Sequence, residues 1–284
     1  MMKLSYSNLS TNKLKKLTQR CILLPHKAFL FQGNVNMKLI TLGTAHGNPT
    51  LTRNNSASIL EVNGELYLFE SGAPVNALMI RNSLPFDKLR AVFVSHSHED
   101  HIGGLPGLIK SLARRTDDGP QTQIFLPEEQ TVTAVTAFVA ATHRMWSENL
   151  LALSTVATGL VYEDENIRVT AYRTRHFDNE NKDFPSYAFA VDAGEKRIVF
   201  TGDVSRHLQD FPVQAFDKDA VCVMECQHYR PEIAGEILRK LSVSRFIGVH
   251  ISDKWDRDPA GFKSALGEVS FPVELAADGM VFEL

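Results

Sequence analysis

The chain has 284 residues, of which 44% are hydrophobic and 22% charged, and its formal net charge is −3. A chain of this length and composition buries a sizeable core in one large domain or two small ones. The slightly acidic net charge argues against the strongly basic class of nucleic-acid-binding domains. The sequence contains no run of about 18 apolar residues, so it predicts no membrane span.

The first elements along the chain are predicted to be strands. Residues 1–36 lack the apolar core and cleavage site of a signal peptide, so we expect a weakly ordered N-terminal extension ahead of one catalytic domain over residues 37–284. Short β-rich stretches follow at Lys38–Leu42, Ser56–Val62 and Glu65–Glu70. The dipeptide Asn63-Gly64 between the last two is typical of a hairpin turn.

The rest of the chain mixes strands and helices. Further strands are expected at Arg90–Ser95, Ile124–Leu126, Ile167–Tyr172, Tyr187–Asp192, Arg197–Thr201, Ala220–Glu225 and Ser244–Val249. Helices are expected at Gly104–Ala113, Glu128–Leu151, Pro231–Lys240 and Pro259–Leu266. The alternating tail indicates an additional edge strand. This order predicts an α/β fold with two mixed sheets flanked by helices, a four-layer αββα sandwich.

Four potential metal ligands follow the apolar strand Arg90–Ser95 within six positions. His96 and His98 are two residues apart, so in extended backbone both side chains point to one side. Asp100 and His101 lie in the turn that follows and approach the same space from another direction. Imidazole and carboxylate groups are common ligands of divalent metals. The segment therefore predicts a metal centre.

Three more ligand types stand where apolar strands end. His176 comes after Ile167–Tyr172, Asp203 after Arg197–Thr201, and His250 after Ser244–Val249. Active-site groups of α/β sheets gather at the carboxyl ends of the strands. Five histidines and two aspartates together suit two borderline divalent ions.

The pattern His-x-His-x-Asp-His, with a downstream His, a Gly-Asp and a second His, resembles the metallo-β-lactamase superfamily over residues 37 to about 255. The resemblance implies one metal on His96, His98 and His176, a second on Asp100, His101 and His250, and Asp203 as the bridge. It also implies that Glu70, where the family usually has Asp, orients the loop of the histidine motif. A histidine at position 98 favours hydrolytic zinc, or manganese, over redox iron.

The segments Leu42–Thr50 and Arg53–Ala57 resemble the opening of ribonuclease Z-like and class II cyclic-nucleotide phosphodiesterase-like members. This likeness implies that His46 and Arg53 lie at the rim of the metal cleft, where Arg53 would pair with a phosphate oxygen. The catalytic residues expected are Asp100, which would orient the attacking water, and His228, which would give a proton to the leaving group.

The predicted function is a metal-dependent hydrolase in which a dinuclear metal centre activates a water to cleave a phosphodiester: a small or cyclic nucleotide, or an RNA end. RNA is disfavoured by the mildly acidic charge. The first alternative is a lactone, ester or thioester hydrolase, and the second is a metal-binding module without catalysis. Arg53, Arg173, Arg175 and Lys182 at the cleft would favour phosphate, whereas a wall of Phe177, Phe184 and Trp255 would favour acyl substrates.

The cysteines Cys21, Cys222 and Cys226 are odd in number and have no C-x-x-C spacing. Such a set argues against a disulfide framework and predicts a reducing, cytoplasmic location. Relatives of the superfamily often form homodimers, and the sequence leaves that state open.

Overall fold

The computed structural model describes residues 35–115, 119–176 and 184–284, which form two seven-stranded sheets. The first sheet has the order β14-β1-β2-β3-β4-β5-β6. Its strands are β1 (Met37–Gly43), β2 (Ala57–Val62), β3 (Glu65–Phe69), β4 (Leu89–Phe93), β5 (Thr122–Leu126), β6 (Leu151–Thr155) and β14 (Met280–Glu283). The pairs from β14 to β3 are antiparallel and those from β3 to β6 are parallel.

The second sheet repeats this arrangement, with the order β13-β12-β11-β10-β9-β8-β7. Its strands are β7 (Gly159–Glu163), β8 (Arg168–Thr174), β9 (Ser186–Ala193), β10 (Lys196–Phe200), β11 (Ala220–Cys226), β12 (Val243–Ile251) and β13 (Val273–Leu275). Pairs from β7 to β10 are antiparallel and those from β10 to β13 are parallel. Both sheets are therefore mixed, as the sequence predicted.

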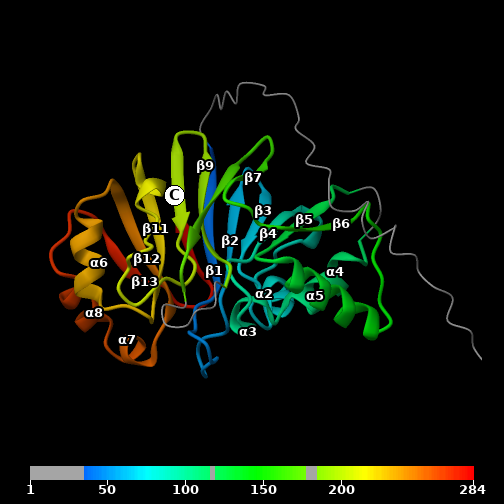
Figure 1. Ribbon diagram of the computed structural model, residues 1–284, viewed down its shortest axis with the longest axis horizontal. Coiled ribbons are helices and arrows are strands. Elements are labelled where there is room, and N and C mark those ends of the chain that lie inside the picture. The colour runs from blue at the N-terminus through cyan, green and yellow to red at the C-terminus, as the bar shows by residue number, and fades with distance from the viewer. Residues whose placement is uncertain (1–34, 116–118, 177–183) are drawn as a thin grey trace, which may run out of the picture. The chain divides into compact units, whose positions relative to one another are not determined.

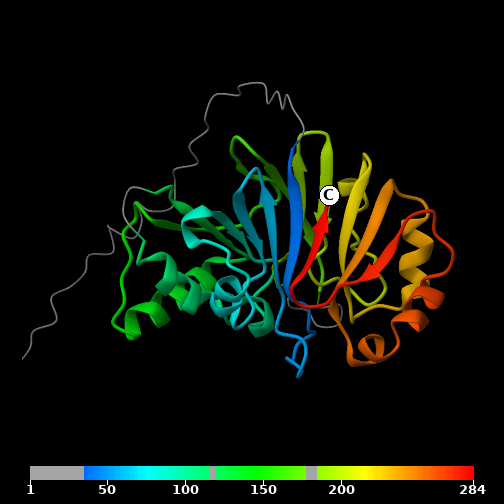
Figure 2. The ribbon, with the colours of Figure 1, turned by 180° about the vertical axis from the view of Figure 1, so that it is seen from behind.

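Helices cover the outer face of each sheet (Figures 1 and 2). The first sheet packs against α2 (Val75–Arg81), α4 (Leu105–Leu112) and α5 (Glu129–Ala141). The second packs against α6 (Pro231–Leu238), α7 (Asp253–Arg257) and α8 (Pro259–Leu266). One turn of helix, α3 (Glu99–Ile102), follows β4. The four-layer αββα prediction is confirmed.

Strands buried on both faces explain the apolar runs of the sequence. In β4 and the residue after it, Ala91 and Phe93 face the core between the sheets, whereas Val92 and Val94 face the core under the helices. This alternation follows from the twofold period of a strand, and it makes each central strand a nearly continuous apolar run.

Stacked aromatic rings fill the core between the sheets. The ring of Phe69 lies 3.9 Å from that of Phe200 and 5.0 Å from that of Phe93, measured between centroids. Phe69→Ala removes a ring that joins both sheets, so we expect it to lower the free energy of unfolding by about 3–5 kcal/mol in urea denaturation. The control Ile80→Ala, at a side chain that is 64% exposed, should cost less than about 0.5 kcal/mol. Equal effects of the two changes would contradict the prediction.

The predicted helix Glu128–Leu151 is wrong in its second half. Helix α5 ends at Ala141, because Thr142 caps it and His143 adopts a left-handed φ of 57°. Leu151–Thr155 then forms β6, which pairs in parallel with β5. Strands β6 and β7 and helices α2, α3 and α7 were not predicted.

Three further expectations concern the N-terminal extension, the cysteines and membrane-spanning helices. Apart from residues 35 and 36, the predicted N-terminal extension lies outside the described residues, so it stays a prediction. Cys222 and Cys226 are buried free thiols. Across the described ranges, no helix has the length and apolar character needed to cross a membrane.

Candidate metal centre

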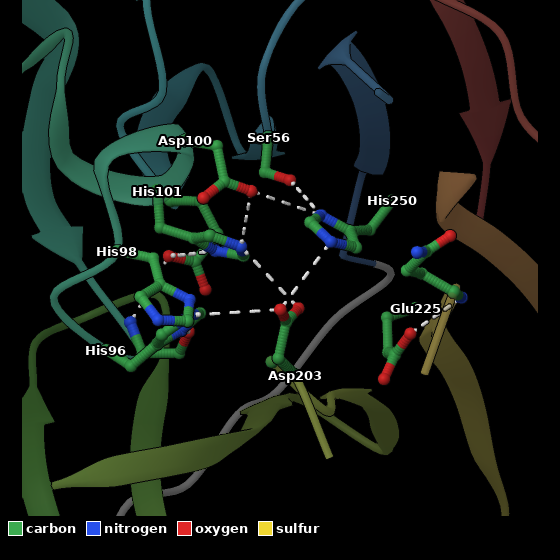
Figure 3. A network of polar contacts seen from close by, with 12 residues as sticks. Ser56, His96, His98, Asp100, His101, Asp203, Glu225 and His250 are labelled. Atoms are coloured by element: carbon green, nitrogen blue, oxygen red, sulfur yellow. Dashed lines mark hydrogen bonds and ion pairs between the residues drawn. The ribbon is translucent and has the colours of Figure 1, made fainter. Parts of the chain in front are cut away.

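The predicted ligands meet at one edge of the two sheets, where their strands end (Figure 3). The first sheet supplies His96 and His98 directly after β4, and Asp100 and His101 from α3. The second sheet supplies the other three after or at the ends of its strands: His176 after β8, Asp203 after β10 and His250 in β12. Neither sheet holds the whole set.

Asp203 lies at the centre of this cluster, with its side chain 2% exposed. Its Oδ2 is 3.5 Å from Nε2 of His250, 3.6 Å from Nε2 of His176 and 3.8 Å from Nε2 of His96. Its Oδ1 is 3.5 Å from Nε2 of His101. Asp203 thus faces ligands of both predicted metals, which is the position of a bridge.

The backbone before Asp203 depends on glycine. Gly202 has a φ of 57°, and a Cβ there would meet the Cβ of Ser95 and the carbonyl oxygen of Tyr187, each at 2.7 Å. Only glycine fits this left-handed turn and close approach, and the turn carries Asp203 into the cluster.

The cluster divides into groups whose ligand atoms all lie within 4.8 Å of one another. One group joins His96, His98 and His176 to Asp203. Another is Asp100, His101 and His250, and a third joins Asp203, His228 and His250. The first two groups coincide with the two ligand sets that the family resemblance implied.

The donor set fits divalent cations. Asp203 Oδ1 and Nε2 of His101 lie 3.5 Å apart, and both are buried without a hydrogen-bond partner. A buried polar atom left unsatisfied costs about 1–3 kcal/mol, so two at one point indicate that another species completes the site. Imidazole and carboxylate donors suit zinc or manganese. The structure is consistent with a binuclear site, and the individual ligand roles stay predictions.

Burial and neighbouring charges set the protonation of the cluster. Burial lowers the pKa of His176 to about 4, more than the negative charge of Asp203 raises it. Burial and the neighbouring His101 also hold the pKa of His96 well below its usual value. The pKa of Asp203 also lies well below its usual range, because His250 and His101 outweigh the opposing effect of burial. Neutral His96 and His176 are in the state that binds metal. Burial lowers the pKa of His101, but the charges of Asp203 and Glu70 raise it well above its usual value, so this ring must lose a proton when a metal binds.

Three side chains behind the ligands hold the rings in place. Glu70 Oε2 accepts a hydrogen bond from the backbone N–H of Ser95 at 3.2 Å and lies 3.2 Å from Nδ1 of His101. Ser95 Oγ lies 3.0 Å from Nδ1 of His96, and Ser56 Oγ lies 2.8 Å from Nδ1 of His250. The Glu70 contacts are those expected of a residue that orients the histidine loop. The sequence did not predict these contacts of Ser56 and Ser95, because their hydroxyls belong to no recognisable spacing pattern.

His228 lies next to the cluster, 3.6 Å from Asp203 Oδ2. Glu225 holds it: Oε1 lies 3.0 Å from Nδ1 of His228, and Oε2 accepts the backbone N–H groups of Gln227 and His228. Burial alone lowers the pKa of His228, but the hydrogen bond and charge of Glu225 raise it to about 9. In the absence of bound cations, this shift keeps a proton on the ring at neutral pH.

The residues expected at the rim of the metal cleft contact other protein groups. Arg53 is buried, and its guanidinium contacts Asp256, Thr44 Oγ1 and the carbonyl of Ala276, so these contacts do not favour a phosphate-binding role. His46 Nε2 lies 3.3 Å from Asp253. Arg173 donates to the carbonyl of Phe184.

The aromatic wall expected for acyl substrates is only partly present. Trp255 is buried in the core beside Phe262, with the ring centroids 5.5 Å apart. Phe177 and Lys182 lie outside the described residues. Phe184 lines a cleft of about 640 Å³ that also borders His96, His98 and His176. A cleft of this size suits a small molecule.

Comparison with known proteins gives the family. The family model described as anti-Pycsar protein Apyc1 matches residues 37–235, which is more than half of the chain. The chain belongs to the Apyc1 family. Six of the seven predicted ligands fall inside the matched residues, and His250 follows them.

Further relatives match about half of the chain or share its fold. Ribonuclease BN of Salmonella gallinarum is 33% identical over 147 residues, which are 49% of this chain and 46% of the ribonuclease. The matched stretch thus spans about half the length of the curated relatives. Human tRNase Z, short form (ELAC1), is 22% identical with a TM-score of 0.70, covering 87% of this chain and 98% of that one.

Two further solved structures share the fold. The metallo-β-lactamase fold protein YhfI from Bacillus subtilis is 19% identical, with a TM-score of 0.69 over 87% of this chain and 99% of that one. Yeast PDE1 is 14% identical, with a TM-score of 0.61 over 88% of this chain and 100% of that one. With the buried cluster, this Apyc1-family chain has the metallo-β-lactamase fold that the histidine motif predicted.

Proposed function

We propose that the chain is a phosphodiesterase that cleaves a small or cyclic nucleotide with the help of two divalent metal ions, zinc or manganese. The observation that carries the proposal is the position of Asp203, whose two carboxylate oxygens face the two ligand groups. The family match and the ribonuclease BN relative support phosphodiester chemistry.

The residues of the cluster divide the work of holding the ions. His96, His98 and His176 would hold one ion, Asp100, His101 and His250 the other, and Asp203 both. Two bound ions would supply a water of lowered pKa and positive charge to offset the charge that develops on the phosphate.

Two side chains complete the proposed chemistry. Asp100 Oδ2 lies 3.3 Å from Nε2 of His101 and 3.7 Å from Nδ1 of His250, at the edge of the cluster. There its carboxylate can accept a hydrogen bond from the attacking water and orient it. His228 is 30% exposed, and the hydrogen bond and charge of Glu225 favour its protonated form, which supports it as the group that would give a proton to the leaving oxygen.

One observation favours a second candidate, a lactone or thioester hydrolase on the same centre. Among the described residues that line the cleft, none is a lysine or an arginine, and its wall includes Phe184 and Pro185. An uncharged acyl substrate needs no basic wall. A mononucleotide diester, however, carries one negative charge, which the two cations can neutralise without further basic residues.

The test measures metal content and hydrolysis together. We expect about two zinc or manganese ions per chain and cleavage of bis(p-nitrophenyl) phosphate and 3′,5′-cyclic nucleotides that chelation abolishes. Asp100→Ala should remove turnover while circular dichroism shows an intact fold, and Asp217→Asn, at an exposed carboxylate, should keep it. Lactone hydrolysis without phosphodiester cleavage would favour the second candidate, and a folded chain that binds no metal would refute both.

A further inference from the structure

We propose that the cleft beside His96, His98 and His176 is a nucleobase subsite, in which the ring of Phe138 stacks on the base of a mononucleotide substrate. The inference rests on the proposed phosphodiesterase function. The metal cluster would bind the phosphate of the substrate, and the cleft would bind its base. The cleft has a volume of about 640 Å³ and runs from the predicted ligands to one face of α5.

Among the described phenylalanines, tyrosines and tryptophans, exposed rings occur only at this cleft. Phe138 is 56% exposed and Phe184 is 48% exposed, and both line the cleft. The other described phenylalanines, tyrosines and tryptophans are buried or partly buried. Leaving apolar rings in water is unfavourable, so two at one cleft beside a metal centre mark a binding surface.

The face of α5 toward the cleft has a regular composition. Thr131, Ala134, Val135 and Phe138 line the cleft at the i, i+3, i+4 and i+7 positions of one helical face. The small side chain of Ala134 precedes the exposed ring of Phe138 on this face. A flat platform next to small side chains is a surface on which a planar group can lie.

The polar groups of the cleft suit a base edge better than an alkyl chain. Glu128 and Gln130 line the cleft at the start of α5 and offer acceptors and donors. Ser97 Oγ lies 2.6 Å from Thr131 Oγ1 and donates to Glu128 Oε1 at 3.3 Å, so this corner is a connected polar patch. An acyl chain would offer these groups no further hydrogen bond, whereas a nucleobase presents both donors and acceptors at its edge.

The charge of the cleft argues against a longer nucleic acid. Its described lining contains one carboxylate, Glu128, and no lysine or arginine. A polynucleotide brings several phosphates, which binding proteins neutralise with basic side chains. A single neutral base attached to one phosphodiester at the metals fits this lining.

The experiment compares a 3′,5′-cyclic nucleotide with the corresponding 3′,5′-cyclic ribose phosphate that lacks a base. Phe138→Ala and Phe138→Leu should raise KM for the nucleotide about fivefold or more, because base stacking on an aromatic ring is lost. KM for the base-free substrate should not change. Phe138→Trp keeps an aromatic face and should keep the wild-type KM. Thr136→Ala, at an exposed position of α5 outside the cleft lining, is the matched control.

The results separate the two proposals. Unchanged KM in Phe138→Ala, or an equal rise for both substrates, would overturn the base subsite while the phosphodiesterase assignment stands. Cleavage of lactones or of RNA, but of no cyclic nucleotide, by the wild-type chain would overturn the proposed function and the subsite with it. A selective rise that Phe138→Trp does not show supports both.

Discussion

Asp203→Ala is expected to abolish hydrolysis and to remove both metal ions. The carboxylate faces His101 and His250 on one side and His96 and His176 on the other, so no other side chain replaces it. Residues that only support a ligand typically contribute 10–100-fold to metal affinity or activity, and a bridging ligand should exceed about 100-fold. Metal analysis of the purified variant and its rate on a cyclic nucleotide measure the two effects.

The comparison for this variant is Asp217→Asn. Asp217 pairs with Arg197 at the surface and belongs to none of the potential metal groups, so its loss should leave metal content and rate unchanged. Circular dichroism separates loss of metal from loss of fold. An Asp203→Ala protein with full metal content and wild-type rate would show that Asp203 is not the bridge.

His228→Ala should lower kcat about 10²–10⁴-fold while metal binding persists, because a proton donor is lost and the predicted ligands remain. Glu225 holds the pKa of His228 at about 9 against the lowering effect of burial. The donor is therefore protonated below that pH and is lost as the pH rises through it. Cations bound nearby lower this pKa, so kcat of the wild type should decline at or below about pH 9, and His228→Ala should lack this decline.

Glu225→Gln provides the related control. The amide keeps the shape of the side chain but removes the charge that raises the pKa of His228, so the alkaline decline should move to lower pH. A His228→Ala enzyme whose kcat still falls at the same alkaline pH would assign the proton donor to another group.

Residues that end apolar strands were the most predictable part of the site. His96, His98, Asp203 and His250 follow runs whose twofold apolar period fixes both the strand and the edge at which it ends. The sequence pattern predicted that the seven ligands lie close together. This prediction did not depend on strand boundaries that were correct to the residue.

Partners separated along the chain were not predictable in the same way. Arg53 was expected at the cleft, but Asp256 and the carbonyl of Ala276 hold its guanidinium inside the fold. Ser56 contacts His250 across 194 positions of sequence. Such pairs depend on how the two sheets pack, and no local period records that packing.

The end of helix α5 could not be predicted from the helix propensity of its residues. The stretch after Ala141 contains no glycine or proline to stop a helix, and the structure stops it through the left-handed His143 and the pairing of β6 with β5. Tertiary pairing, which the sequence does not display locally, outweighs helical preference there.

The division of the ligands between the two sheets ties catalysis to the integrity of the whole sandwich. His96, His98, Asp100 and His101 follow a strand of one sheet, and His176, Asp203 and His250 follow strands of the other, so an ion on either group cross-links them. Free metal at 100 times its dissociation constant would add about 2.7 kcal/mol to the free energy of unfolding. Metal supply would therefore set both the lifetime of the fold and the fraction of molecules able to react, and a chain with one sheet misassembled would be inactive as well as unstable.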